Sequence, residues 1–231
     1  ITSFDNTWTQ VWGEKKEIRN HYNDLKIELL ETGDLNRELT IVFRVFDDGI
    51  GFRYEFPEQE NLSSFNIMNE LTEFNLTGDH TAWWIGAYQW NRFEYLTNET
   101  PLSEADTVHT PLTMKTDDDL YLSIHEAALV NYSTMTLERT EGNRLEANLM
   151  PWYDGVRVRT QAPSVTPWRT IQISDTPGGL ITSYLILNLN EPNELEDTSW
   201  IDPGKYVGIW WEMHIDKSTW GPGPKHGATT E

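Results

Sequence analysis

The chain has 231 residues and a mass of 26.8 kDa, and it carries a formal net charge of −20 at pH 7 with a pI near 4.5. So negative a surface repels nucleic acid and anionic membranes, and it favours neutral or cationic ligands and divalent cations. Cysteine is absent, which excludes disulfides and thiol chemistry, and no apolar run is long enough to span a bilayer.

Two further features of the composition concern export and sugar binding. Ile1 is followed by polar residues, so this sequence shows no signal peptide. The chain also holds 11 Trp. Tryptophan fills large β cores, and it also stacks on the apolar faces of sugar rings; composition alone slightly favours the core role.

The first quarter of the chain predicts antiparallel strands. In residues 8–12, Trp8, Gln10 and Trp12 alternate with Thr9 and Val11, which predicts a strand. A charged loop follows at 14–20, and Asn23–Glu31 predicts a half-buried strand. Glu38–Phe56 predicts a β-hairpin, because two alternating runs flank Asp48-Gly49, a dipeptide suited to a tight turn.

Two arginines and one long segment need separate expectations. Arg44 and Arg53 lie in apolar strands of the predicted hairpin, so we expect each to pair with a buried carboxylate. Residues 80–111 are rich in Trp, Tyr, Asn and Thr without clear alternation, which predicts a long irregular loop.

The central stretch, Tyr121–Tyr132, alternates with a period of two and predicts a strand. Glu126 falls on the same face as Leu122 and Ile124, where a carboxylate is costly unless a cation or hydrogen-bond donors meet it. Two readings follow: Glu126 is wet at a strand end or paired with an arginine, or it binds a positive ligand. The residues alone favour the first reading.

The remaining elements are predicted as follows. Residues 134–137 and 144–150 form a strand pair, 166–174 form a strand, and 180–189 form a strand or a helix. Many short strands and almost no helix indicate an antiparallel sandwich over residues 1–190.

The character of the chain changes after Asn190. Residues 191–204 are acidic and loop-like, which indicates a linker. Lys205–Met213 is apolar without alternation, as is typical of a strand buried on both faces in a parallel barrel. No helix pattern follows this strand, so residues 205–231 are expected to be the start of a truncated second domain.

No complete active site is visible in the sequence. The zinc pattern H-E-x-x-H, the G-x-S-x-G elbow and the phosphate-binding loops are all missing, and the six His show no metal-ligand spacing. Glycoside hydrolysis needs two carboxyl groups, but 37 acidic residues offer too many candidates for the sequence to choose between them.

Several blocks taken together resemble glycoside hydrolase family 97, and they occur in the family's order over most of the chain. The blocks are Trp12–Asn20 with Tyr22-Asn23, Phe43–Glu55, His125–Leu129, Thr166–Arg169, Leu187–Glu191 and Gly208–Trp211.

The resemblance implies a fold and an activity. The expected architecture is an antiparallel β-super-sandwich, galactose mutarotase-like, followed by the first strand of a truncated (β/α)8 barrel. It implies the N-terminal portion of a calcium-dependent, exo-acting α-glucosidase from the bacterial periplasm or a secreted fraction. An α-galactosidase of the same family and a non-catalytic carbohydrate-binding sandwich are the alternatives, and inverting against retaining stereochemistry stays open.

The resemblance also implies site residues. Glu126 matches a family glutamate that reaches from the sandwich to an active-site Ca²⁺, whose other ligands are barrel carboxylates. The catalytic acid and base lie further along the barrel, so the 231 residues alone are expected to be inactive. Trp210, Trp211 and Trp220 are expected near the barrel mouth, as contacts for an oligosaccharide substrate. The expected partners are that substrate and the rest of the chain's own barrel, with neither nucleic acid nor membrane insertion.

Overall fold

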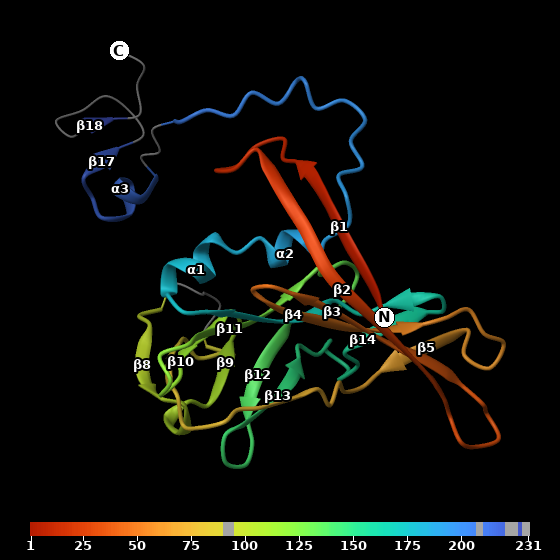
Figure 1. Cartoon of the computed structure of the whole chain (residues 1–231). Coiled ribbons are helices and arrows are strands. Elements are labelled where there is room, and N and C mark those ends of the chain that lie inside the picture. Colours follow the sequence, from red (N-terminus) through yellow and green to blue (C-terminus); the bar gives the residue numbers. More distant parts are fainter. Residues whose placement is uncertain (90–94, 207–209, 220–225, 228–231) are drawn as a thin grey trace. The chain divides into compact units, whose positions relative to one another are not determined.

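The computed structural model describes residues 1–89, 95–206, 210–219 and 226–227. The chain divides into two compact units, of which the first comprises residues 1–9 and 17–193 and the second residues 10–16 and 194–231. The first unit consists mainly of antiparallel strands, as the alternating patterns predict (Figure 1).

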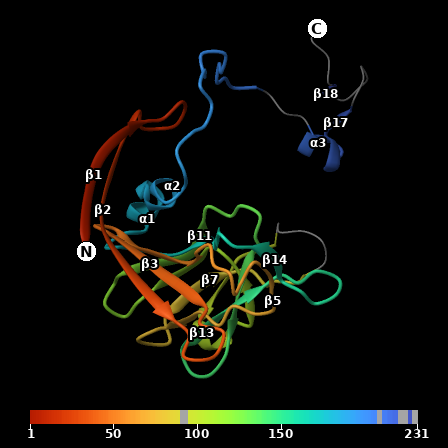
Figure 2. The ribbon, with the colours of Figure 1, turned by 90° about the vertical axis from the view of Figure 1, so that its right-hand side faces the viewer.

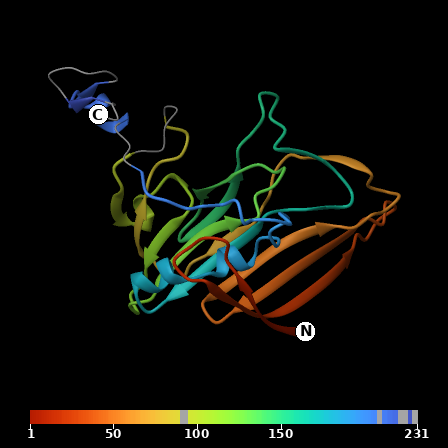
Figure 3. The same ribbon diagram turned by 90° about the horizontal axis from the view of Figure 1, so that it is seen from above.

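A ten-stranded sheet dominates the part of the first unit that the structure describes. Its order is β1-β2-β3-β4-β16-β11-β10-β7-β8, and β15 pairs with β4 at the side. Figure 3 shows the long ribbons of β1–β4 in red and orange. The strands are β1 (Thr2–Thr9), β2 (Glu17–Leu30), β3 (Glu38–Phe46), β4 (Gly49–Phe56), β7 (Thr81–Trp84), β8 (Asn98–Pro101), β10 (Leu112–Lys115), β11 (Tyr121–Ala127), β15 (Ser164–Val165) and β16 (Trp168–Ser174).

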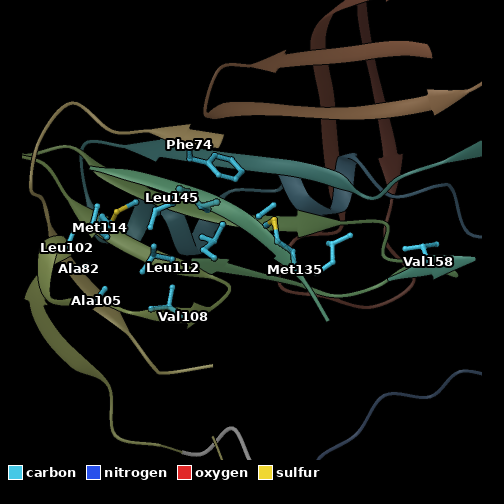
Figure 4. Close-up of a cluster of buried hydrophobic side chains, with 14 residues drawn as sticks. Phe74, Ala82, Leu102, Ala105, Val108, Leu112, Met114, Met135, Leu145 and Val158 are labelled. Carbon is cyan, nitrogen blue, oxygen red and sulfur yellow. The ribbon is translucent and has the colours of Figure 1, made fainter. Parts of the chain in front are cut away.

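A smaller sheet packs on one face of the large one and encloses the main core. It has the order β6-β13-β12-β9, formed by β6 (Glu73–Asn75), β9 (Thr107–His109), β12 (Met135–Arg139) and β13 (Arg144–Leu149). Leu112 and Ile124 of the large sheet meet Leu137 and Leu145 of the small sheet in this core, and all four are 0% exposed (Figure 4). Burying each such side chain contributes about 1.5–3 kcal/mol. A separate ribbon pairs β5 (Ser64–Ile67) with β14 (Val158–Gln161).

Two short helices cover the other face of the large sheet, α1 (Pro177–Thr182) and α2 (Leu185–Asn188) (Figures 1 and 2). Residues 180–189 therefore adopt the helical alternative. Thr176 caps α1 by accepting a hydrogen bond from the Gly179 amide, and Pro177 fits the first helical turn. Leu185 and Leu189, four residues apart, point to the same side and pack against Trp168 in a second apolar cluster.

The predicted hairpin is confirmed, and both arginines pair with carboxylates, although these carboxylates are partly rather than fully buried. β3 and β4 pair across Asp48-Gly49. Arg44 reaches Asp24 at 3.4 Å, and Arg53 reaches Glu55 at 2.6 Å, both partly buried. The two guanidinium groups also lie 4.7 and 4.5 Å from the ring of Trp168, so each cation gains an aromatic neighbour.

The prediction of an irregular loop over residues 80–111 is wrong in part. The segment contains β7, β8, β9 and a 3₁₀ turn (η1, Leu102–Glu104), while residues 90–94 lie outside the described part. Strands of three or four residues are too short to show alternation, and it is pairing with neighbouring strands that forms them. Similarly, β2 begins at Glu17, inside the charged segment expected to be a loop, because it pairs with β1 at an exposed edge.

The predicted barrel strand differs from the structure of the second unit. Trp210–His214 form a short helix, α3, and residues 207–209 lie outside the described part. A central parallel strand needs partners on both sides, and within the described residues this segment has none, so its backbone forms local hydrogen bonds such as Ile215 N–H to the Trp211 carbonyl. The unit also pairs β17 (Ser218–Thr219) with β18 (His226–Gly227). Across the described residues, every helix is too short or too polar to cross a membrane.

Candidate functional site

Three charged side chains meet in the interior of the first unit. Arg169 is 0% exposed, Glu126 is 6% exposed and Glu70 is 8% exposed. Arg169 donates from Nε and Nη2 to the two oxygens of Glu70, at 2.7 and 2.6 Å. Its Nη1 donates to Oε2 of Glu126 at 2.6 Å. Short, charge-assisted bonds of this kind are about twice as strong as neutral ones.

The sheet register places the first two of these residues. Glu126 on β11 lies directly opposite Arg169 on β16. Glu70 arrives from the irregular segment between β5 and β6 and completes the cluster from a distant part of the sequence. Burial lowers the pKa of the Arg169 guanidinium, but the bonds to Glu70 and the charge of Glu126 outweigh burial and raise that pKa, so Arg169 stays charged.

Both oxygens of the Glu70 carboxylate accept two hydrogen bonds each from the protein. Besides the two bonds from Arg169, its Oε1 accepts from Thr72 Oγ1 at 3.0 Å and its Oε2 accepts from the Tyr132 hydroxyl at 3.2 Å. Four donors occupy the four lone-pair positions of a carboxylate. Burial and the negative charge of Glu70 raise the pKa of Tyr132 above its usual value, so this hydroxyl remains a donor.

The carboxylate of Glu126 accepts fewer hydrogen bonds than that of Glu70. Its Oε1 accepts from Thr134 Oγ1 and from the backbone N–H of Met135, both at 3.1 Å, and its Oε2 accepts from Arg169. Three donors leave one lone-pair position without a donor among the described residues. This geometry matches the first of the two interpretations drawn from the sequence, in which Glu126 pairs with an arginine.

Glu126 also borders an open pocket of about 340 Å³, together with His109, His125 and Thr110. Burial lowers the pKa of both histidines, although the charge of Glu126 partly opposes this at His125. His125 Nδ1 lies 3.0 Å from Thr110 Oγ1. In the buried cluster, two carboxylates, Glu70 and Glu126, share the single guanidinium of Arg169.

The described residues do not form a calcium site by themselves. Calcium takes six to eight oxygen ligands. No group of three or more candidate metal-binding side chains gathers anywhere in the described ranges. Glu126 can offer one oxygen lone pair, and the remaining ligands would have to come from outside the described residues.

The other predicted site residues lie in the second unit or outside the described part. Trp210 and Trp211, on α3, are 61% and 63% exposed. The Trp210 ring meets the ring of His214 edge-on, with centroids 4.2 Å apart. Trp220 lies outside the described residues.

The sequence reading missed Glu70 and Arg169 as members of the site. Arg169 did carry a signal, because it shares a strand face with Ile171 and Ile173 and so poses the same burial problem as Glu126. Two opposite charges on the apolar faces of two predicted strands suggest a cross-strand pair. Glu70 gave no signal, because it lies in a segment without periodicity.

Comparison with known proteins identifies the family. The family model for the glycosyl-hydrolase 97 N-terminal domain matches residues 1–192. The chain therefore belongs to glycoside hydrolase family 97, and the matched part corresponds to the family's N-terminal domain.

Individual relatives agree with this assignment. A retaining α-galactosidase from Bacteroides thetaiotaomicron is 26% identical over 227 residues, with 84% of this chain and 33% of that protein covered. A probable retaining α-galactosidase from Streptomyces bingchenggensis is 31% identical over 183 residues, with 77% and 27% covered. A family 97 enzyme from Pseudoalteromonas sp. strain K8, solved in complex with acarbose, is 48% identical with a TM-score of 0.91, with 99% of this chain and 35% of that one covered. The chain thus spans about a third of the length of these relatives.

Proposed function

We propose that this chain is the N-terminal portion of an exo-acting α-glucosidase that removes terminal α-linked glucose from oligosaccharides. The observation that carries the proposal is the 48% identity, over 99% of the chain, to an enzyme solved with acarbose and, as a variant, with panose. Panose is an α-linked glucose trisaccharide, so the variant of that relative was solved with a ligand built from α-linked glucose.

An α-galactosidase is the second candidate, because both curated relatives above carry that name. Their identities of 26% and 31% are lower than 48%, which is why we put glucose first. The test is the ratio of hydrolysis rates for an aryl α-glucoside and an aryl α-galactoside, measured with a protein extended to the length of its relatives. A clear preference for the galactoside would overturn the order of the two candidates.

We place the catalytic acid and base outside these 231 residues, in the barrel. The 231-residue chain is therefore expected to hydrolyse neither substrate, while the extended protein hydrolyses one of them. Hydrolysis by the short chain at a rate comparable to the extended protein would show that the catalytic carboxylates lie within it. If the extended protein were also inactive but bound oligosaccharides, the chain would be a carbohydrate-binding sandwich.

We further propose that Glu126 contributes one oxygen to a calcium ion in the extended protein. Two features support this: the lone-pair position of Glu126 that has no donor among the described residues, beside an open pocket, and the sharing of one guanidinium by two buried carboxylates. Calcium bound near the reaction centre would supply positive charge that polarises a sugar oxygen. In the chain itself, Arg169, Thr134 and the Met135 amide hold the carboxylate of Glu126 in one orientation.

The calcium proposal is tested with Glu126→Gln and Glu126→Ala in the extended protein. Calorimetric titration is expected to show weaker calcium binding in both variants, and the turnover of both variants is expected to fall. In the parent protein, addition of a chelator is expected to lower turnover. Unchanged calcium affinity in both variants would leave Glu126 with a structural role only.

For localisation, we propose the periplasm or secretion, and cell fractionation of the source bacterium tests this.

A further inference from the structure

A pocket of about 620 Å³ opens on the first unit beside the buried cluster. Its wall includes Asn131, Tyr132, Trp152, Arg157 and Arg159. The volume lies in the range of about 300–1,000 Å³ that is usual for small-molecule pockets. Tyr132 connects the wall to the buried cluster, because it lines the pocket and its hydroxyl donates to Glu70.

Trp152 is presented to the pocket by a tight turn. Its backbone N–H donates to the Val156 carbonyl at 2.8 Å, and its carbonyl accepts from the Gly155 amide at 2.9 Å. Gly155 has a φ of +86°, which a residue with a side chain adopts only with strain. The turn holds the indole outward, so Trp152 remains 59% exposed. A large exposed aromatic ring on a fixed turn is costly to leave in water and is suited to a ligand with an apolar face.

Arg157 supplies polar groups without a partner. The neighbouring Arg159 pairs with Asp154 and lies 5.8 Å from the Trp152 ring centroid. Arg157 is half-buried, and its guanidinium has neither a carboxylate nor another hydrogen-bond partner among the described residues. In a chain with 37 acidic and 17 basic residues, an arginine without an acid is unexpected. The amide of Asn131, on the same wall, also lacks a described partner.

We propose that this Trp152 pocket binds a neutral saccharide. The C–H face of a pyranose ring is apolar and covers the exposed indole. A vicinal pair of sugar hydroxyls accepts two parallel hydrogen bonds from the guanidinium of Arg157, whose fork geometry suits such a pair. The amide of Asn131 both donates to and accepts from hydroxyls. A neutral sugar fits better than an anionic one, because the net charge of −20 repels anions at long range. The binding site lies within this chain and does not depend on the proposed hydrolysis.

The test is calorimetric and NMR titration of the 231-residue chain with maltotriose. Saturable binding is expected, with a Kd that rises about tenfold or more in Trp152→Ala and in Arg157→Ala. Arg157→Lys keeps the charge but loses the fork, so it is also expected to bind more weakly. Tyr153→Ala is the matched control, because Tyr153 is the next aromatic residue, is 97% exposed and does not line the pocket.

Circular dichroism shows whether each variant keeps its strands, so that only folded variants are compared. The proposal is overturned if the parent chain does not bind maltotriose saturably, or if Tyr153→Ala weakens binding as much as Trp152→Ala. Binding of glucuronic acid but not of neutral sugars would also overturn it. Hydrolysis is not measured in this titration, so failure here leaves the α-glucosidase proposal untouched.

Discussion

Replacing Arg169 by Met tests the role of the buried charged cluster most directly. Methionine has a similar length and keeps the apolar packing, but it removes three charge-assisted hydrogen bonds and the only cation that faces both Glu70 and Glu126 among the described residues. Two buried carboxylates then face each other without compensation. Removing one partner of a buried ion pair costs about 3–5 kcal/mol of folding stability.

Urea denaturation followed by tryptophan fluorescence measures this loss. With a slope of about 3 kcal/mol per M of urea, the midpoint is expected to fall by about 1–2 M. Arg144→Met is the control, because Arg144 forms a partly exposed pair with Glu73 at 3.4 Å. Such exposed pairs contribute about 0–1 kcal/mol, so the control midpoint is expected to move little.

A triple variant separates the loss of charge balance from a loss of packing. Neutralising all three groups in Arg169→Met, Glu70→Gln and Glu126→Gln removes the uncompensated charge, so the triple variant is expected to be more stable than Arg169→Met alone. If the single variant lost less than about 1 kcal/mol, or the triple variant were no more stable than it, the cluster would not act as a coupled ion pair network and our reasoning would be refuted.

Three further predictions concern other parts of the first unit. Because the pKa of Tyr132 is raised in the folded protein, it contributes stability that is present below pH 10 and is lost as the pH rises above it. The free energy of unfolding is therefore expected to fall in alkali. Tyr132→Phe is expected to flatten that fall, and denaturation at pH 9–11 measures it. Gly49→Ala is expected to be far more destabilising than Gly33→Ala in thermal melts, because a Cβ at Gly49 would lie 2.2 Å from the Ile171 carbonyl oxygen, whereas a Cβ at Gly33 would meet no atom within 4 Å. Equal melting temperatures would contradict this. Leu112→Ala, at a 0% exposed core position, is expected to cost about 2–5 kcal/mol, whereas Leu71→Ala, at a 73% exposed position, is expected to cost little; urea midpoints compare them.

Much of the large sheet could be predicted from the sequence. β3, β4, β11 and β16 are long enough to show alternation, and Asp48-Gly49 marks the turn of the hairpin. The strands between residues 80 and 111 could not be predicted, because three or four residues carry too little periodicity. The short helix at Trp210–His214 was mistaken for a strand because an apolar run without alternation fits either element.

The sequence by itself determined that Glu126 lies on the apolar face of a strand, because this follows from alternation alone, and that a buried carboxylate there would need a cation or hydrogen-bond donors. It also determined the antiparallel class of the fold, since local patterns repeat along the chain. Only the tertiary structure decided that the partner within this chain is Arg169 and that Glu70 joins them from 56 residues before Glu126. The reason is physical: the pairing of β11 with β16 and the course of an irregular segment are long-range contacts, and no local pattern encodes which charges such contacts bring together.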